Sequence, residues 1–137
     1  PGNVGTVIRC ADAFGAERVI LGEGSADAFG QKTVRAAMGS LFRVPTERAS
    51  LAETIEKLKN DGYTVYAAML DRDSVRIDAI EKGGRLAFVI GNEGHGISDE
   101  VRGACDGSVI IPMRDDGAES LNAAVAASVI MWEHKRI

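Results

Sequence analysis

The chain of 137 residues is 45% apolar and 26% charged, which is the composition of one folded domain and excludes a disordered polypeptide. Its longest apolar run, residues 121–132, is interrupted by polar residues and is shorter than the roughly 20 residues that a membrane span requires. The net charge of −4 excludes the broad basic surface of a nonspecific nucleic-acid binder, although basic residues outnumber acidic ones, six to five, in residues 1–50.

The first half of the chain alternates between helical and extended patterns. Apolar residues at helical spacing, β-branched runs and a Ser50–Glu53 capping box mark the elements, and Gly15 and Gly62 would each end a helix. A glycine-rich loop separates the first strand from the second helix. The expected order is helix, strand, helix, strand, helix, over residues 3–14, 18–22, 31–40, a short strand ending at Pro45, and 50–62.

The second half continues the alternation. It predicts strand, strand, helix, strand and helix over residues 63–70, 85–90, 98–105, 108–113 and 120–135. Such a pattern predicts an α/β fold with a mostly parallel sheet that is covered by helices on both faces. The last helix is apolar around its whole circumference, and because a small domain has one core, we expect a second copy of the chain to cover its other side.

The two cysteines, Cys10 and Cys105, lie far apart, and the chain shows no secretory signal sequence. We therefore expect reduced cysteines and a cytoplasmic protein. Because residue 1 is proline rather than methionine, we also expect that residues 1–137 are one domain of a longer protein with a further domain before it.

The loop at residues 91–96, GNEGHG, follows a predicted strand and precedes a predicted helix, where open α/β sheets bind ligands. Its glycine spacing is not that of a dinucleotide fingerprint, it has no Walker lysine, and Glu93 would repel a pyrophosphate. The loop suits a ligand that carries hydroxyl groups, an adenine edge or positive charge. A tight turn without a ligand is the alternative interpretation.

Polar residues at the ends of two predicted helices are further candidates. Asn3 and Arg9 do not share a helix face, and the simplest roles for them are a helix cap and a solvated or ion-paired cation. Ser120 and Asn122 open the last helix. Ser120 alone would be a cap, whereas the pair with the helix N-terminus could receive a phosphate or a carboxylate.

Other chemistry has less support. His95 and His134 share no ligand spacing with the cysteines, so we expect no metal site, and no nucleophile elbow of a hydrolase is visible. Lys32 and Arg35 lie one helical turn apart beside the glycine-rich loop. They could hold an RNA backbone or simply form a solvated helix face.

Three segments in order carry a family resemblance: PGNVGTVIRCADAFGA (1–16), LAFVIGNEGHGIS (86–98) and IPMRDDGAESLNAAVAASVIMWE (111–133). Together with SADAFGQKTVRAAMGSLFRVP (25–45), they resemble the SpoU/TrmH family of RNA ribose 2′-O-methyltransferases within the SPOUT superfamily. The resemblance covers nearly the whole chain. It implies S-adenosylmethionine (AdoMet) as methyl donor and a deep C-terminal trefoil knot, which periodicity alone would not suggest because knots are rare.

The resemblance also implies site residues. The donor-binding positions of the family correspond to Ile90, Gly91, Glu93, Gly94, Ile111, Met113, Ser120, Leu121 and Ala123. Its active-site positions correspond to Asn3, Arg9, Glu93, Ser120 and Asn122. Arg9 would contact the RNA, together with Lys32 and Arg35, which the spacing of the residues and not the resemblance suggests. The chain departs from the family pattern in the longer, charged turn with Arg114, Asp115 and Asp116, and in Ala124, where a serine is common.

Arg9 is the family's base or orienting residue. Since a guanidinium loses its proton only above about pH 12, base catalysis near neutral pH would cost roughly 7 kcal/mol. We therefore expect a cation that binds the neighbouring phosphate and stabilises the developing alkoxide, with base catalysis as the alternative. Asn3 and Glu93 would orient it, and Ser120 and Asn122 would hold the sugar-phosphate.

The segments CADAFGA and ESLNAAVAA resemble the ribosomal-RNA branch of the family, so the resemblance implies ribosomal RNA as substrate, with tRNA as the alternative. We expect a preceding domain to select the RNA. DNA is excluded because it has no 2′-hydroxyl. Two other classes of protein remain possible at this point: a noncatalytic RNA-binding or assembly module with the same fold, and a nucleotide-binding domain of an oxidoreductase. The absence of a phosphate-binding loop argues against the second.

Overall fold

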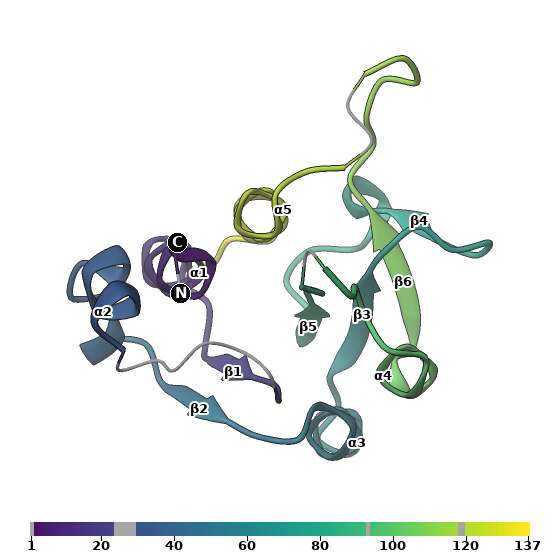
Figure 1. The fold of residues 1–137 in the computed structure, drawn as a ribbon. Coiled ribbons are helices and arrows are strands. Elements are labelled where there is room, and N and C mark those ends of the chain that lie inside the picture. Colours follow the sequence, from purple (N-terminus) through teal and green to yellow (C-terminus); the bar gives the residue numbers. More distant parts are fainter. Residues whose placement is uncertain (1, 24–29, 93, 118–119) are drawn as a thin grey trace. The chain divides into compact units, whose positions relative to one another are not determined.

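The computed structural model describes residues 2–23, 30–92, 94–117 and 120–137 (Figure 1). The chain divides into two compact units. Unit 1 comprises the chain up to Leu51 together with Ala127–Ile137, and unit 2 comprises Ala52–Ala126. In the part of the chain that the structure describes, no helix is long and apolar enough to cross a membrane.

Unit 1 is built on a short parallel strand pair and three helices. Its elements are α1 (Gly2–Phe14), β1 (Val19–Leu21), α2 (Gln31–Ala37), the 3₁₀ turn η1 (Ser40–Phe42), β2 (Thr46–Arg48) and most of α5 (Ala123–Glu133). Val19 pairs with Thr46 in the parallel register of β1 and β2. The predicted glycine-rich loop includes residues 24–29, which lie outside the described residues.

The core of unit 1 forms where one side of α1 meets its neighbours. Ile8 is completely buried and packs with Leu21, Ala37 and Leu41. α1 and α2 approach closely because Gly5 has no side chain: a Cβ there would lie 2.7 Å from the carbonyl oxygen of Thr33 and would also meet Ala36. The apolar residues of α1 recur at helical spacing, and the side of the helix that carries them faces the core.

A polar cluster fixes the end of this helix pair. The Asp12 carboxylate accepts hydrogen bonds from Arg43 Nε and Ser40 Oγ, each at 2.8 Å. These bonds, the Arg43 bond foremost, lower the pKa of Asp12. They tie η1 to α1, since Ser40 is buried and Asp12 lies on α1.

Unit 2 contains a four-stranded parallel sheet in the order β4-β6-β3-β5 (Figure 1). Its elements are α3 (Leu51–Asn60, of which Leu51 belongs to unit 1), β3 (Thr64–Ala68), β4 (Val75–Arg76), the 3₁₀ turn η2 (Ile77–Ala79), β5 (Leu86–Val89), α4 (Asp99–Ala104) and β6 (Gly107–Ile110). Tyr66 pairs with Phe88 on one side of β3 and with Gly107 on the other.

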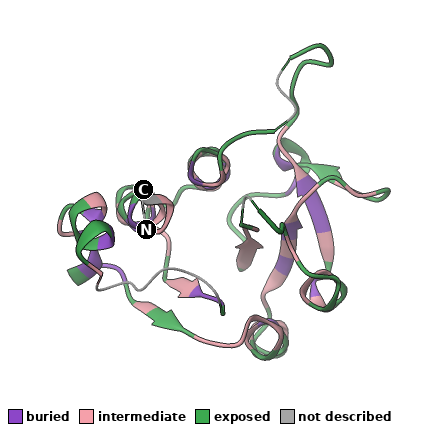
Figure 2. Cartoon of the chain, in the orientation of Figure 1, coloured by how far each residue is buried: buried purple, intermediate pink, exposed green. Residues whose placement is uncertain are grey.

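One face of this sheet carries the core of unit 2. Val65 and Ala67 are completely buried and pack with Ile55 of α3 and with Cys105, which follows α4. Figure 2 shows these buried residues along β3, alternating with half-buried ones. That alternation is the period-2 pattern of a strand with one face against helices.

The mostly parallel α/β fold is confirmed, with strands that all pair in parallel but form two sheets. β6 ends at Ile110 rather than at Met113, and two boundaries of unit 1 differ from the predictions. The second strand begins at Thr46 rather than ending at Pro45, whose carbonyl instead accepts from the Val19 N–H. The second helix ends at Ala37, where Met38 takes a left-handed conformation. The sequence pattern did not predict β4 and η2, and the knot remains a prediction.

Candidate active site

The carboxyl ends of β3, β5 and β6 form one edge of the unit 2 sheet. Because the three strands are parallel neighbours, the residues that follow them lie along this edge. Ile90 and Gly91 follow β5, Ile111 and Met113 follow β6, and Leu70 follows β3. Leu70 is 82% exposed and Met113 is 43% exposed, so apolar side chains stand open to solvent where α/β sheets bind ligands.

The turn after β5 is closed by its own hydrogen bonds. Asn92 Oδ1 accepts from the backbone N–H groups of Gly94 and His95, at 2.9 and 2.7 Å, and the Asn92 carbonyl accepts from the Gly96 N–H at 2.9 Å. These three N–H groups therefore donate within the turn and do not form a cradle for a phosphate. The geometry therefore agrees with the sequence analysis, which predicted that this loop does not bind a phosphate.

Two glycines of this turn are required by its geometry. A Cβ at Gly91 would lie 2.7 Å from the carbonyl carbon of Gly96 and 2.9 Å from Ile97 Cγ1, and Gly96 has φ +65°. Glu93, expected to bind the donor and to orient Arg9, lies outside the described residues. The tight turn and the ligand site are thus compatible interpretations, since the turn leaves Gly91 partly accessible at the sheet edge.

The loop after β3 is fixed by serine hydroxyls and an ion pair. Ser74 Oγ donates to the Met69 carbonyl at 2.8 Å and accepts from the Asp71 N–H at 2.7 Å. Asp71 pairs with Arg102 at 2.9 Å. Its pKa is lowered, first by a hydrogen bond from the backbone N–H of Arg72 and then by Arg102. Leu70 is therefore presented by an ordered loop.

The segment between β6 and α5 includes the longer charged turn. Arg114 pairs with Asp116 at 3.0 Å, and both side chains are well exposed. The helix α5 begins at Ala123, three residues later than predicted. Its cap is Asn122, whose Oδ1 accepts from the N–H groups of Ala124 and Val125 at 2.9 and 3.2 Å.

Ser120 is therefore not the helix cap, because it lies two residues before Asn122 and is exposed. Leu121 is also exposed and Ala123 is half-buried. An asparagine that caps a helix needs only its amide oxygen for that purpose. A cap function and a place in the active site are thus both open to Asn122.

The first motif lies on α1 in unit 1. Asn3 falls within the helix, which begins at Gly2, so it is not an N-cap, and it has a partner in the structure. Arg9 is exposed. It lies one turn after Gly5, which contacts α2, and one turn before Asp12, which binds η1, so Arg9 is on the side of α1 that bears these two contacts.

Lys32 and Arg35 are exposed on α2. Among the described residues, neither these two side chains nor Arg9 forms a hydrogen bond or ion pair. Unit 1 thus brings the expected RNA-contacting cations onto neighbouring helices. Unit 2 brings the expected donor-binding residues after β5 and β6 to one sheet edge.

Sequence reasoning missed Leu70 and Asn92. The signal for Asn92 was present, because an asparagine two residues before a glycine is typical of a side-chain turn. The signal for Leu70 in the sequence was only its position after a predicted strand.

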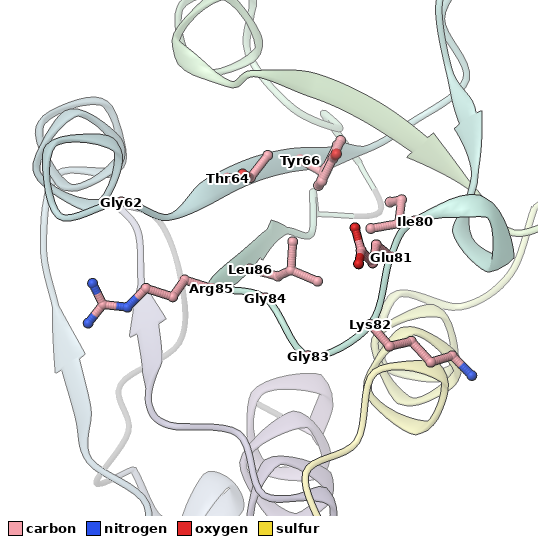
Figure 3. A pocket seen from close by; sticks show the side chains of 10 residues that line it. All are labelled: Gly62, Thr64, Tyr66, Ile80, Glu81, Lys82, Gly83, Gly84, Arg85 and Leu86. Carbon is pink, nitrogen blue, oxygen red and sulfur yellow. The ribbon is translucent and has the colours of Figure 1, made fainter.

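A hollow of about 470 Å³ lies at the opposite end of the sheet, where β3 and β5 begin (Figure 3). Thr64, Tyr66 and Leu86 line it. Figure 3 shows the charged ends of Arg85 and Lys82 extending outward in opposite directions. Arg85 lies over the Tyr63 ring, 5.0 Å from its centroid, so neither basic group points into the hollow, and Glu81 is the third charged residue of its lining.

Comparison with known proteins gives consistent results over the length of this chain. It is 40% identical over 132 residues to the 23S rRNA (guanosine(2553)-2′-O)-methyltransferase RlmP of Bacillus subtilis (strain 168), covering 96% of this chain and 52% of that protein. The fold is similar to that of an AdoMet-bound rRNA methyltransferase from Sinorhizobium meliloti, with a TM-score of 0.89, 37% identity, and coverage of 98% of this chain and 51% of the other.

The SpoU methyltransferase AviRb from Streptomyces viridochromogenes, in complex with AdoMet, is similarly related: TM-score 0.86, 34% identity, and 98% and 55% of the two chains. The chain thus spans about half the length of the relatives it matches. A sequence model of the SpoU rRNA Methylase family matches residues 1–132. The resemblance that the three motifs carry is therefore confirmed, and the chain belongs to the SpoU rRNA Methylase family.

Proposed function

We propose that this chain is the catalytic domain of an AdoMet-dependent RNA 2′-O-ribose methyltransferase. The observation that carries the proposal is the sheet edge of unit 2, where a turn that uses its own N–H groups stands beside open apolar side chains. Such an edge fits a ligand without phosphate. The family and its AdoMet-bound relatives support the same donor.

The residues present fit AdoMet. Ile90, Ile111 and Met113 offer apolar surface for an adenine ring, and the close-packed backbone at Gly91 leaves room at the edge. We assign the donor to these residues together with Glu93, Gly94, Ser120, Leu121 and Ala123, and we add Leu70. When bound, AdoMet supplies a methyl group on a sulfonium that an oxygen nucleophile can displace.

Arg9 is the residue we place nearest the chemistry of the RNA. It is a cation with no partner among the described residues, which suits it to bind a phosphate and to stabilise a developing 2′-alkoxide. Base catalysis by Arg9 is the less favoured variant because a guanidinium gives up its proton reluctantly. Asn3 and Glu93 would orient Arg9, and Ser120 and Asn122 would hold the sugar-phosphate.

Ribosomal RNA is the proposed substrate. The relatives RlmP and the Sinorhizobium meliloti protein are named as rRNA methyltransferases and share 40% and 37% identity with this chain. An A. aeolicus TrmH/SpoU tRNA modifying enzyme shares 26%. tRNA is therefore the second candidate. Because the chain spans half of such proteins, we assign selection of the RNA to a preceding domain.

We also propose a cytoplasmic location. Cys10 and Cys105 are free thiols in the structure, and free thiols are typical of proteins in that compartment.

We also propose that a second copy covers α5. Val125, Val129 and Trp132 are 48%, 37% and 54% exposed and form one stripe, while Ala124, Ala127 and Ile130 are buried on the other side. An exposed apolar stripe of this kind is typical of an oligomer interface. Sedimentation at micromolar concentration should show a dimer, and Val129→Lys should give a monomer; a wild-type monomer would contradict the proposal.

The test of the proposed function is transfer of labelled methyl groups to ribosomal RNA, followed by mapping of the modified riboside. Arg9→Ala should abolish transfer and leave AdoMet affinity, measured by isothermal titration, unchanged. Turnover by Arg9→Ala would remove Arg9 from the mechanism. A wild-type chain that binds donor and RNA without turnover would instead support the noncatalytic RNA-binding module.

A further inference from the structure

Three large apolar side chains point to solvent on α2, at its C-cap and on η1. Val34, Met38 and Phe42 are 36%, 64% and 81% exposed and recur at four-residue spacing. Their neighbours Thr33, Ala37 and Leu41 are buried. Figure 2 shows the resulting alternation of exposed and buried residues along α2. We name Lys32, Val34, Arg35, Met38 and Phe42 the α2–η1 surface.

The exposure of Phe42 is built into an ordered turn. Ser40 and Leu41 on one side of Phe42 are buried, and Ser40 and Arg43 are both hydrogen-bonded to Asp12 on α1. The Phe42 N–H donates to the Gly39 carbonyl at 3.2 Å. The ring is therefore held outward by anchored neighbours and is not the end of a loose segment.

The exposure of Met38 is likewise part of an ordered turn. With φ +52°, it is the one non-glycine residue with positive φ among the described residues. Glycine or asparagine is the usual residue in that conformation. A methionine that is 64% exposed contributes little to the core, so packing does not account for a large apolar side chain here.

The charge around these side chains favours a polyanion. Residues 31–43 contain Lys32, Arg35 and Arg43 and no acidic residue, in a chain whose net charge is −4. Lys32 and Arg35 are exposed and, within the described part of the chain, form no ion pair. An exposed aromatic ring beside unpaired cations is typical of surfaces that bind single-stranded nucleic acid.

The elements that carry the α2–η1 surface pack against the helix that carries Arg9. Gly5 contacts α2 and Asp12 binds η1, and Arg9 lies between these two contacts along α1. An RNA strand whose phosphate is bound by Arg9 would therefore pass close to the elements that carry the α2–η1 surface.

We propose that Phe42 stacks on an unpaired base next to the target nucleotide, with Met38 and Val34 extending the apolar contact and Lys32 and Arg35 binding the flanking phosphates. This inference rests on the proposed function, in that the chain binds RNA and Arg9 binds a phosphate beside the target nucleotide. It adds a base-contacting residue outside the donor site, and it limits the substrate to RNA that is single-stranded at this position.

The test is RNA affinity without methyl donor. The 137-residue chain is titrated into a fluorescein-labelled, single-stranded RNA of about 20 nucleotides, and binding is followed by fluorescence anisotropy. Phe42→Ala should weaken binding about 5- to 150-fold, the range for loss of one stacked base. Phe42→Trp should retain affinity, whereas Phe42→Leu, apolar but without a ring, should behave as Phe42→Ala. The same RNA in a duplex should bind more weakly.

The salt dependence separates stacking from charge. Lys32→Ala and Arg35→Ala should each lower the slope of log affinity against log salt by about 0.7, while Phe42→Ala should leave the slope unchanged. Lys57→Ala, an exposed cation on α3, is the matched control and should change neither quantity. Because Phe42 is so exposed, circular dichroism melting of its variants should match the wild type.

The outcomes distinguish this inference from the proposed function. Wild-type affinity in both Phe42→Ala and Phe42→Leu would overturn the inference even if the chain methylates RNA. Conversion of a dimer to a monomer by Phe42→Ala, with RNA affinity intact, would make the surface a protein contact and would also overturn it. Loss of affinity in Phe42→Ala by a chain that transfers no methyl group would support the inference and overturn the enzymatic proposal.

Discussion

Gly5 is the position at which adding one methyl group should do the most damage for its size. In a helix interior, alanine is about 1 kcal/mol more favourable than glycine, so Gly5→Ala would stabilise an isolated α1. In the protein the new Cβ would lie 2.7 Å from the Thr33 carbonyl oxygen and 3.0 Å from the Ala37 nitrogen. Both atoms belong to the backbone of α2, so no side-chain rotation relieves the contact.

Overpacking costs about 1–3 kcal/mol, and contacts with backbone place this case at the upper end. After the helix gain of about 1 kcal/mol is subtracted, Gly5→Ala should lower the free energy of unfolding by roughly 2 kcal/mol. Gly103 is the matched control. It lies in α4 with nothing within 4 Å of an added Cβ, so Gly103→Ala should raise the free energy of unfolding by about 0.5–1 kcal/mol.

Urea unfolding followed by circular dichroism measures both variants against the wild type. The two effects should have opposite signs and differ by about 3 kcal/mol. If Gly5→Ala proves as stable as the wild type, the close approach of α1 and α2 is not a constraint on this fold. Since the two helices carry Arg9 and the α2–η1 surface, Gly5→Ala should also weaken RNA binding.

Three further predictions concern the polar groups that order the loops. Asn122→Ala should lower the free energy of thermal unfolding by about 1 kcal/mol because the α5 cap is lost, while Asn122→Asp should keep the cap. Equal melting temperatures of the wild type and both variants would contradict the capping role. Asn92→Ala removes two turn hydrogen bonds, worth about 1 kcal/mol each, and should weaken AdoMet binding by up to about 30-fold in isothermal titration. Unchanged affinity would show that the turn is not part of the donor site. The pKa values of Asp12 and Asp71 are lower in the folded chain than in the unfolded one, so the stability they contribute is complete above the ordinary carboxyl pKa and is lost as the pH falls below about 4. Between neutral pH and about pH 3, the free energy of unfolding in urea should therefore fall less in a chain with Asp12→Asn and Asp71→Asn than in the wild type, and an equal fall would refute the role of these two carboxylates.

Most elements lie where the sequence predicted them. α1, β1, α3, β3, β5 and α4 are all within a residue or two of their predicted bounds, because apolar spacing and the caps or glycines that flank it mark both kinds of element. β4 spans only Val75–Arg76, which is too short for any period to show. The start of α5 was misplaced because Ser120 and Asn122 are both good caps, and only the backbone path decides which of them meets the first free N–H groups.

The candidate site was predictable in its residue types more than in its geometry. The glycines of the 91–96 turn predicted a tight bend, and the structure adds that Asn92 closes it. Lys32 and Arg35 were recognisable as cations near a loop, yet the exposed ring of Phe42 was not. A phenylalanine between Leu41 and Arg43 has the pattern of a core residue, and its outward direction follows from Met38, whose left-handed backbone ends α2.

Unit 1 is assembled from two stretches of chain that are separated by all of unit 2. Cys10 Sγ lies 3.1 Å from Ser128 Oγ across 118 residues of sequence, and the Arg136 N–H donates to the Phe14 carbonyl at 3.0 Å. Bringing such distant segments together costs loop-closure entropy that is recovered only once both are present. During synthesis, α1 can pack against α2 and η1 as soon as these have emerged, but its Cys10 side stays uncovered until the last helix is made, and a chaperone or protease would meet that side in the interval.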